Sequence, residues 1–238
     1  MLRIAALVLA LAVCVALSGC GSSSPASAPL SSEGVLASVV AAARAQTSVH
    51  WTSTNYGEFA GIWTETADVG KNSGSEREVS SVFGTVRIRF AQGTVYVRGS
   101  VRQLREMAGL SRAEARRYAG RWISIPRGDH WYGAIADGLT LASIIHDVTT
   151  CDLGEGTRLT IVRKKPQGQR LVGLRWANPK GPGQECRLSA SGSRRPLPVS
   201  SRFFGPGRGS SLHLSKWNEP VHVEAPTSST PIATVRRN

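Results

Sequence analysis

Residues 85–98 read TVRIRFAQGTVYVR, and this stretch decides the fold class. Apolar side chains occupy every second position on either side of a turn at Ala91-Gln92-Gly93, which predicts two half-buried antiparallel strands. The apolar set consists of Val86, Ile88, Phe90, Val95 and Val97. Arginine and threonine fill most of the positions between them, so one face of the predicted hairpin is apolar and the other is polar.

Similar alternation occurs on both sides of this hairpin. Upstream, residues 48–52 and 62–66 predict two strands that follow an amphipathic helix at 35–46. Downstream, strands are predicted at 158–164, 171–176, 186–190, 197–204 and 210–217. Helical periodicity marks residues 101–108, 112–119 and 130–148, the last interrupted near Gly138. The order predicts an α+β fold in which helices pack against one face of a curved antiparallel sheet.

The N-terminus carries an export signal. Arg3 precedes an apolar run from Ile4 to Leu17, which is shorter than the roughly 20 residues that a membrane-spanning helix needs. The run ends at Leu17-Ser18-Gly19-Cys20, which resembles a bacterial lipobox. That resemblance implies a diacylglycerol, together with fatty acyl groups such as palmitate, on Cys20. The alternative is an ordinary cleaved secretory signal in which the cysteine occurs by chance.

We therefore expect four segments: a lipoprotein signal peptide (1–19), a Ser/Pro-rich tether (20–31), one folded domain (32–227) and a loose Thr/Ser/Pro-rich tail (228–238). The predicted location is the extracytoplasmic face of the cell membrane, held there by the lipid on Cys20.

The chain is strongly basic, with a formal net charge of +13. In an exported protein this charge favours anionic lipid head groups or an anionic envelope polymer as the partner, or it serves only solubility. No nucleic-acid partner is expected. Arg87, Arg89, Arg98 and Arg175 share the polar faces of predicted strands, where they either bind phosphate or sulfate groups or form a solvated convex face.

Two cysteines remain besides Cys20 and Cys14, which lies within the predicted signal peptide. In an oxidising compartment Cys151 and Cys186 have one intramolecular pairing available, and we predict that disulfide. Two thiols without a histidine at ligand spacing do not predict a metal site.

Several segments resemble the LppX/LprAFG-type cell-envelope lipoproteins, whose fold is related to LolA-like half-barrels. Besides the lipobox and tether, the resemblance rests on residues 35–51, 93–99, 118–126 and 216–226. It implies a half-barrel sheet whose concave face, covered by helices, forms a hydrophobic cavity for acyl chains. It also implies that the protein binds or carries a lipid or lipoglycan.

The expected lining of that cavity combines the apolar strand face with apolar helix residues, and plain core packing is the alternative for each. The candidates are Val86, Ile88, Phe90, Val95, Val97, Leu104, Leu139, Leu141, Ile144 and Ile145. No catalytic motif, metal or cofactor is predicted, so we expect a non-enzymatic lipid-binding lipoprotein. The alternative is an interaction or scaffold module that contacts an anionic wall polymer or a protein partner through its basic surface.

Overall fold

The computed structural model describes residues 31–58, 61–151, 153, 157–164, 171–178 and 183–237. The predicted signal peptide, Cys20 and the tether up to residue 30 lie outside the described residues.

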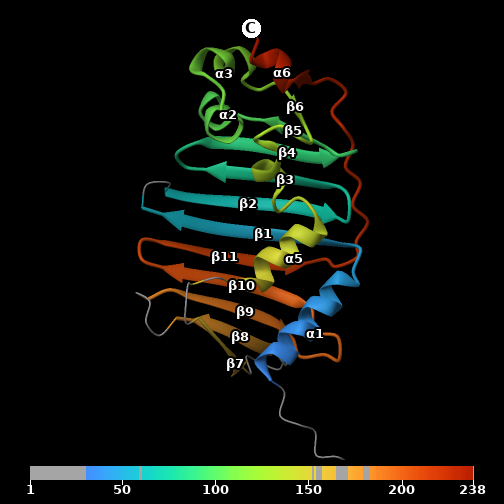
Figure 1. Ribbon diagram of the computed structural model, residues 1–238, viewed down its shortest axis with the longest axis vertical. Coiled ribbons are helices and arrows are strands. Elements are labelled where there is room, and N and C mark those ends of the chain that lie inside the picture. Colours follow the sequence, from blue (N-terminus) through green and yellow to red (C-terminus); the bar gives the residue numbers. More distant parts are fainter. Residues whose placement is uncertain are drawn as a thin grey trace, which may run out of the picture. The chain divides into compact units, whose positions relative to one another are not determined.

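Within the described residues, twelve strands form one open sheet in the order β12-β6-β5-β4-β3-β2-β1-β11-β10-β9-β8-β7 (Figure 1). The strands are β1 (Ser48–Gly57), β2 (Gly61–Gly70), β3 (Gly74–Ser80), β4 (Gly84–Ala91), β5 (Thr94–Arg98), β6 (Ile123–Pro126), β7 (Arg158–Lys164), β8 (Leu171–Ala177), β9 (Glu185–Ser191), β10 (Pro198–Gly205), β11 (Arg208–Ser215) and β12 (Thr230–Pro231). Neighbouring strands are antiparallel except for the short parallel pair β12–β6.

Two meanders meet at the centre of this sheet. Strand β1 pairs with β2 on one side and with β11 on the other, so that Trp51 lies opposite Ala67 and also opposite Leu214. This pairing joins residues that are more than 150 positions apart along the chain. The predicted hairpin 85–98 forms β4 and β5, with Phe90 opposite Val95.

The helices are α1 (Ser32–Arg44), α2 (Val101–Ala108), α3 (Arg112–Tyr118), α4 (Tyr132–Ala136), α5 (Leu141–Thr149) and α6 (Ile232–Val235). Side-chain caps fix where several of them begin. The Ser31 hydroxyl accepts a hydrogen bond from Gly34 N at the start of α1, and capping boxes open α2 at Ser100, α3 at Ser111 and α5 at Thr140. Helices α1 and α5 lie across one face of the sheet (Figure 1).

Among the described residues, the core forms three apolar clusters along the helix-covered face. Strands β4–β6 pack against α2, α3, α4 and α6, strands β1, β2 and β11 pack against α5, and strands β8 and β9 pack against α1. The predicted α+β class, with helices on the concave face of a curved antiparallel sheet, is confirmed.

Two parts of the structure differ from the sequence-based expectations. Strand β3 reads GSEREVS, and it lacked the apolar alternation by which the other strands were predicted. The prediction of a loose tail at 228–238 is wrong for residues 230–235, which form β12 and α6. Ile232 and Val235 are almost fully buried in the β4–β6 cluster, so two apolar side chains anchor a segment whose composition is otherwise polar.

No helix in the described part of the chain is both long enough and apolar enough to cross a membrane.

Candidate functional site

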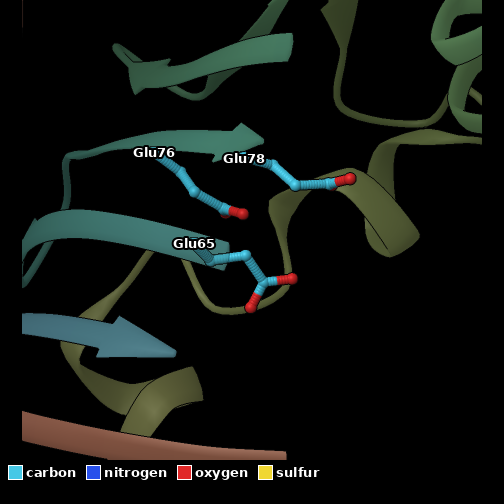
Figure 2. Close-up of side chains that lie close together, drawn as sticks. All are labelled: Glu65, Glu76 and Glu78. Carbon is cyan, nitrogen blue, oxygen red and sulfur yellow. The ribbon is translucent and has the colours of Figure 1, made fainter. Parts of the chain in front are cut away.

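Three glutamates project from the helix-covered face at the centre of the sheet (Figure 2). Glu65 on β2 lies directly opposite Glu78 on β3, and Glu76 precedes Glu78 by two positions on the same face. One carboxylate oxygen of each residue lies within 4.8 Å of those of the other two. Glu65 also accepts hydrogen bonds from Asn55 Nδ2 at 3.0 Å and from Trp63 Nε1 at 2.9 Å.

This arrangement changes the charge of the cluster. Burial, reinforced by the charges of Glu65 and Glu78, raises the pKa of Glu76 to about 8. Burial and the charge of Glu65 also raise the pKa of Glu78. Glu76 therefore holds a proton at neutral pH, and its carboxyl group can both donate and accept a hydrogen bond. Three carboxylates are ligands that suit a hard cation, but a protonated Glu76 weakens that role and we assign no ion.

A hollow of about 220 Å³ opens beside the cluster, between the sheet and α5. Its sheet side includes Glu65, Glu76 and Trp51, and its helix side includes Ile144 and Asp147. Burial and the nearby Asp137 raise the pKa of Asp147 to about 6, although His146 opposes the shift. The indole Nε1 of Trp51 is buried and has no hydrogen-bond partner among the described residues.

A second hollow, of about 250 Å³, shares Asp147 and Ser210 with the first. Its lining includes the apolar side chains of Val148, Trp176 and Phe203 together with Thr150 and Ser201. The two hollows together form what we call the α5 trough, which is acidic at the end near Glu65 and Glu76 and aromatic at the end near Trp176 and Phe203.

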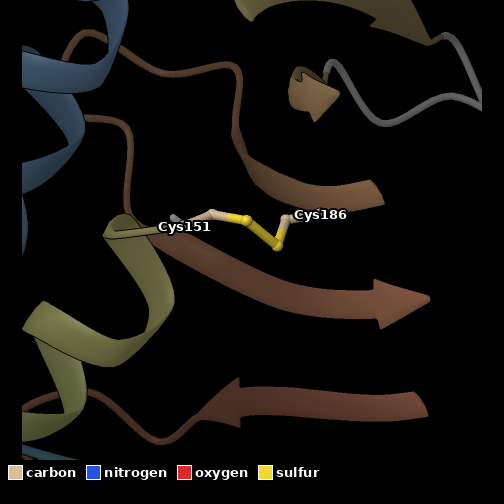
Figure 3. The surroundings of a disulfide bond; sticks show 2 residues. All are labelled: Cys151 and Cys186. Carbon is tan, nitrogen blue, oxygen red and sulfur yellow. A yellow bond between two sulfur atoms is a disulfide. The ribbon is translucent and has the colours of Figure 1, made fainter. Parts of the chain in front are cut away.

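Two features hold α5 in this place. Gly74 on β3 lies so close to the chain before the helix that a Cβ atom there would come within 2.2 Å of the Leu139 carbonyl oxygen. At the other end of the helix, the predicted Cys151–Cys186 disulfide is present and joins the residues after α5 to β9 (Figure 3).

The structure places the predicted cavity-lining residues in two separate core clusters. Val86, Ile88, Phe90, Val95, Val97, Leu104 and Leu139 pack in the β4–β6 cluster, and Leu141, Ile144 and Ile145 pack under α5. All ten are at most 7% exposed. Ile144 borders the α5 trough, whereas Ile88 borders a separate hollow of about 530 Å³. A single cavity lined by all ten of these residues therefore stays a prediction.

Sequence reasoning missed the acidic cluster. Glu76 and Glu78 lie on the strand that was not predicted, because charged residues fill the inward positions where apolar ones were expected. Glutamate at alternating positions, in a segment long enough to be a strand, was the signal that would have revealed it.

The arginines predicted to share a polar face do lie on the face that the helices leave uncovered. Arg87 and Arg89 line the hollow of about 530 Å³, together with Trp122 and His222. The Arg89 guanidinium lies 5.1 Å from the centroid of the Trp122 ring and donates to the carbonyl oxygen of Glu224 at 3.3 Å.

Solved structures with the same architecture include LprF from Mycobacterium bovis, which is 14% identical to this chain and has a TM-score of 0.51. That match covers 83% of this chain and 97% of LprF. The Mycobacterium tuberculosis lipoprotein LppX is 17% identical, with a TM-score of 0.49 and coverage of 82% of this chain and 100% of LppX. No protein-family model matches the sequence, and no curated protein matches it significantly. The fold is of the LprF type.

Proposed function

We propose that this chain, which has an LprF-type fold, is a non-enzymatic lipoprotein that binds an amphiphilic lipid of the cell envelope. The lipid on Cys20 anchors it at the extracytoplasmic face of the membrane, and the tether from 20 to 31 lets the folded domain reach away from that membrane. The apolar run from Ile4 to Leu17 and the lipobox-like residues that end at Cys20 support this anchoring.

The α5 trough is the observation that carries the proposal. Two hollows of about 220 and 250 Å³ share the lining residues Asp147 and Ser210, so they are neighbours on the helix-covered face and their combined volume matches that of a ligand pocket. One end offers aromatic and aliphatic surface, where each buried CH₂ of a ligand contributes about 0.8 kcal/mol. The other end offers hydrogen-bonding groups, so its two ends match an amphiphile.

The acidic end selects among head groups. Glu65, Glu76, Asp137 and Asp147 all line it, and a phosphate placed among them would be repelled. A sugar head group suits them instead, because its hydroxyls donate to carboxylates and accept from a protonated Glu76. We therefore expect a glycolipid or an amine-bearing lipid rather than an anionic phospholipid.

A pair of tryptophan substitutions on one strand tests the trough. Ser210 is half-buried and lines both hollows, whereas its neighbour Ser211 is exposed on the opposite face of β11. The full chain is extracted from its membrane in mild detergent, and the lipids that copurify with it are identified and counted by mass spectrometry.

We expect one lipid species at a fixed molar ratio in the wild type and in Ser211→Trp, and its loss in Ser210→Trp. Circular dichroism melting verifies that both variants fold. The same lipid ratio in both variants, or no lipid at a fixed ratio in the wild type, would overturn the proposal. Separately, Cys20→Ala is expected to release the chain from the membrane fraction.

A further inference from the structure

Three arginines lie directly opposite one another on the face of the sheet that carries no helix within the described residues. Arg77 on β3 pairs with Arg87 on β4, and Arg87 pairs with Arg98 on β5. All three are exposed, and no hydrogen bond or ion pair holds them within the described part of the chain. Directly opposed like charges destabilise a sheet, so this arrangement costs stability unless an anion joins it.

The same pattern recurs at the other end of this face. Arg202 on β10 lies opposite Arg187 on β9, which lies opposite Arg175 on β8. Glu185 bridges Arg175 and Arg187, so this second triad keeps a net positive charge. Although burial opposes the shift, hydrogen bonds from Arg187 and Arg175 lower the pKa of Glu185, which stays ionised at neutral pH.

Exposed polar side chains connect the two triads along two neighbouring rows of the sheet. The first row continues from Arg77 through Thr66, Thr52 and His213. The second continues from Arg202 through Ser211, Thr54 and Thr64. Asp68 also lies on this face, where it pairs with His50 Nδ1 at 2.7 Å.

The separation of the triads sets the size of a ligand that reaches both. Four strand steps separate the nearest members, Arg77 and Arg202, and six separate the central ones, Arg87 and Arg187. At about 4.8 Å per step, the separation is roughly 20 to 30 Å along the sheet. A free phosphate or a single lipid head group is too small to contact both triads.

We propose that this uncovered face binds a linear anionic polymer that carries phosphate or sulfate groups and that contacts both arginine triads. Guanidinium groups match such anions with paired hydrogen bonds, and a bound anion relieves the repulsion within each triad. The threonine and serine hydroxyls between the triads supply hydrogen bonds to the intervening polymer.

The curvature of the sheet favours a polymer over a membrane surface. The helices lie on the concave face, so the arginines lie on the convex one. A flat bilayer touches a convex surface in one place and would meet one triad at a time. A flexible chain can follow the curve and contact both. This site lies on the opposite face from the α5 trough and does not depend on the proposed lipid ligand.

Binding of sized polymers tests this proposal. The full chain, held in a non-ionic detergent, is titrated with dextran sulfate fractions whose extended lengths are below about 20 Å and above about 30 Å. We expect the longer fraction to bind at least about tenfold more tightly at equal sulfate concentration, because engaging the second triad is then intramolecular. Affinity should fall steeply as salt is raised.

Charge-matched variants separate the triads from the general basic charge. Arg87→Gln and Arg187→Gln should each abolish the advantage of the longer fraction. Arg105→Gln removes the same charge from the exposed side of α2 and should leave that advantage intact. Arg87→Gln should not lower the melting temperature, since it removes a repulsion.

Three results would overturn the proposal. The first is equal binding of the short and long fractions, and the second is an equal effect of Arg105→Gln and Arg87→Gln. The third is binding to phosphatidylglycerol vesicles that exceeds polymer binding and is lost in the triad variants, which would assign the face to the membrane surface.

Discussion

Glu65 on β2 and Glu78 on β3 occupy directly opposed positions on the helix-covered face of the sheet. Opposed like charges at such a pair destabilise a sheet, and burial adds to the cost because it disfavours ionised carboxylates. Glu76, on the same face, responds with a pKa of about 8. The acidic cluster therefore lowers the stability of the fold at neutral pH, and it gives the α5 trough a polar surface.

Acidification should stabilise the fold between about pH 8 and pH 4.5. The folded-state pKa of Glu76 lies above its unfolded value of 4.5, so the folded state binds the proton more tightly in that range. The stabilising contribution of the proton on Glu76 is fully present below pH 4.5 and is lost as the pH rises through about 8. We expect a change on the order of 2–4 kcal/mol in the free energy of unfolding, measured by urea denaturation.

Replacing Glu76 isolates this effect. Glu76→Gln should flatten the pH dependence above pH 6 and raise stability at pH 8, while Glu106→Gln, on the exposed side of α2, should leave the profile unchanged. In Glu76→Gln, Asp147, whose pKa is raised to about 6, should still make the free energy of unfolding decrease with rising pH, but by a smaller amount. A wild-type profile that rises with pH between 5 and 8 would contradict the assignment.

The sequence allowed the architecture to be predicted wherever periodicity and side-chain burial agree. The hairpin 85–98, the helix at 101–108 and the Cys151–Cys186 pair all follow from local patterns. The acidic site did not, because Glu76 and Glu78 break the alternation by which strands are recognised. Its location depends on the pairing of β3 with β2, which local sequence does not encode.

The same limit applies to the arginine triads. The sequence showed that arginines alternate with apolar residues on separate strands. It did not show the register, and a shift of two residues would have separated Arg77 from Arg87. Directly opposed arginines are visible only once the strands are paired.

Reduction of the disulfide should destabilise the domain and loosen α5. Cys151 and Cys186 are 35 residues apart in the sequence, and closing a loop of that size contributes roughly 3–4 kcal/mol to stability. Thermal unfolding of the oxidised and reduced forms measures the difference. Hydrogen exchange should rise first in α5, next to the bridge, and an equal rise in α2 would argue against a local role.

The C-terminal segment should behave as part of the core. Ile232 is 1% exposed within the cluster of β4–β6, so Ile232→Ala should cost about 2–4 kcal/mol in the free energy of unfolding. Ser229→Ala, at an exposed position three residues earlier, should change stability by less than about 0.5 kcal/mol. Similar small effects for both variants would mean that α6 does not pack as described.

Trp51 should contribute to ligand binding more than to stability. Its buried Nε1 has no hydrogen-bond partner among the described residues, and an unsatisfied donor of this kind costs about 1–3 kcal/mol. Trp51→Phe removes that donor while it keeps an aromatic ring beside Leu214. The gain offsets part of the packing loss, so we expect stability without ligand to change by no more than about 1 kcal/mol.

Binding should respond differently, because Trp51 lines the acidic end of the α5 trough. If a ligand oxygen accepts the indole N–H, losing that bond should lower the amount of copurifying lipid about fivefold, as expected for a free-energy loss near 1 kcal/mol. Trp217→Phe is the matched control, since Trp217 packs against the same apolar cluster and lies after β11. Lipid content is measured by mass spectrometry. Equal lipid content in wild type and Trp51→Phe would show that the indole N–H faces no ligand. Loss of lipid from Trp217→Phe alone would place the binding site outside the trough.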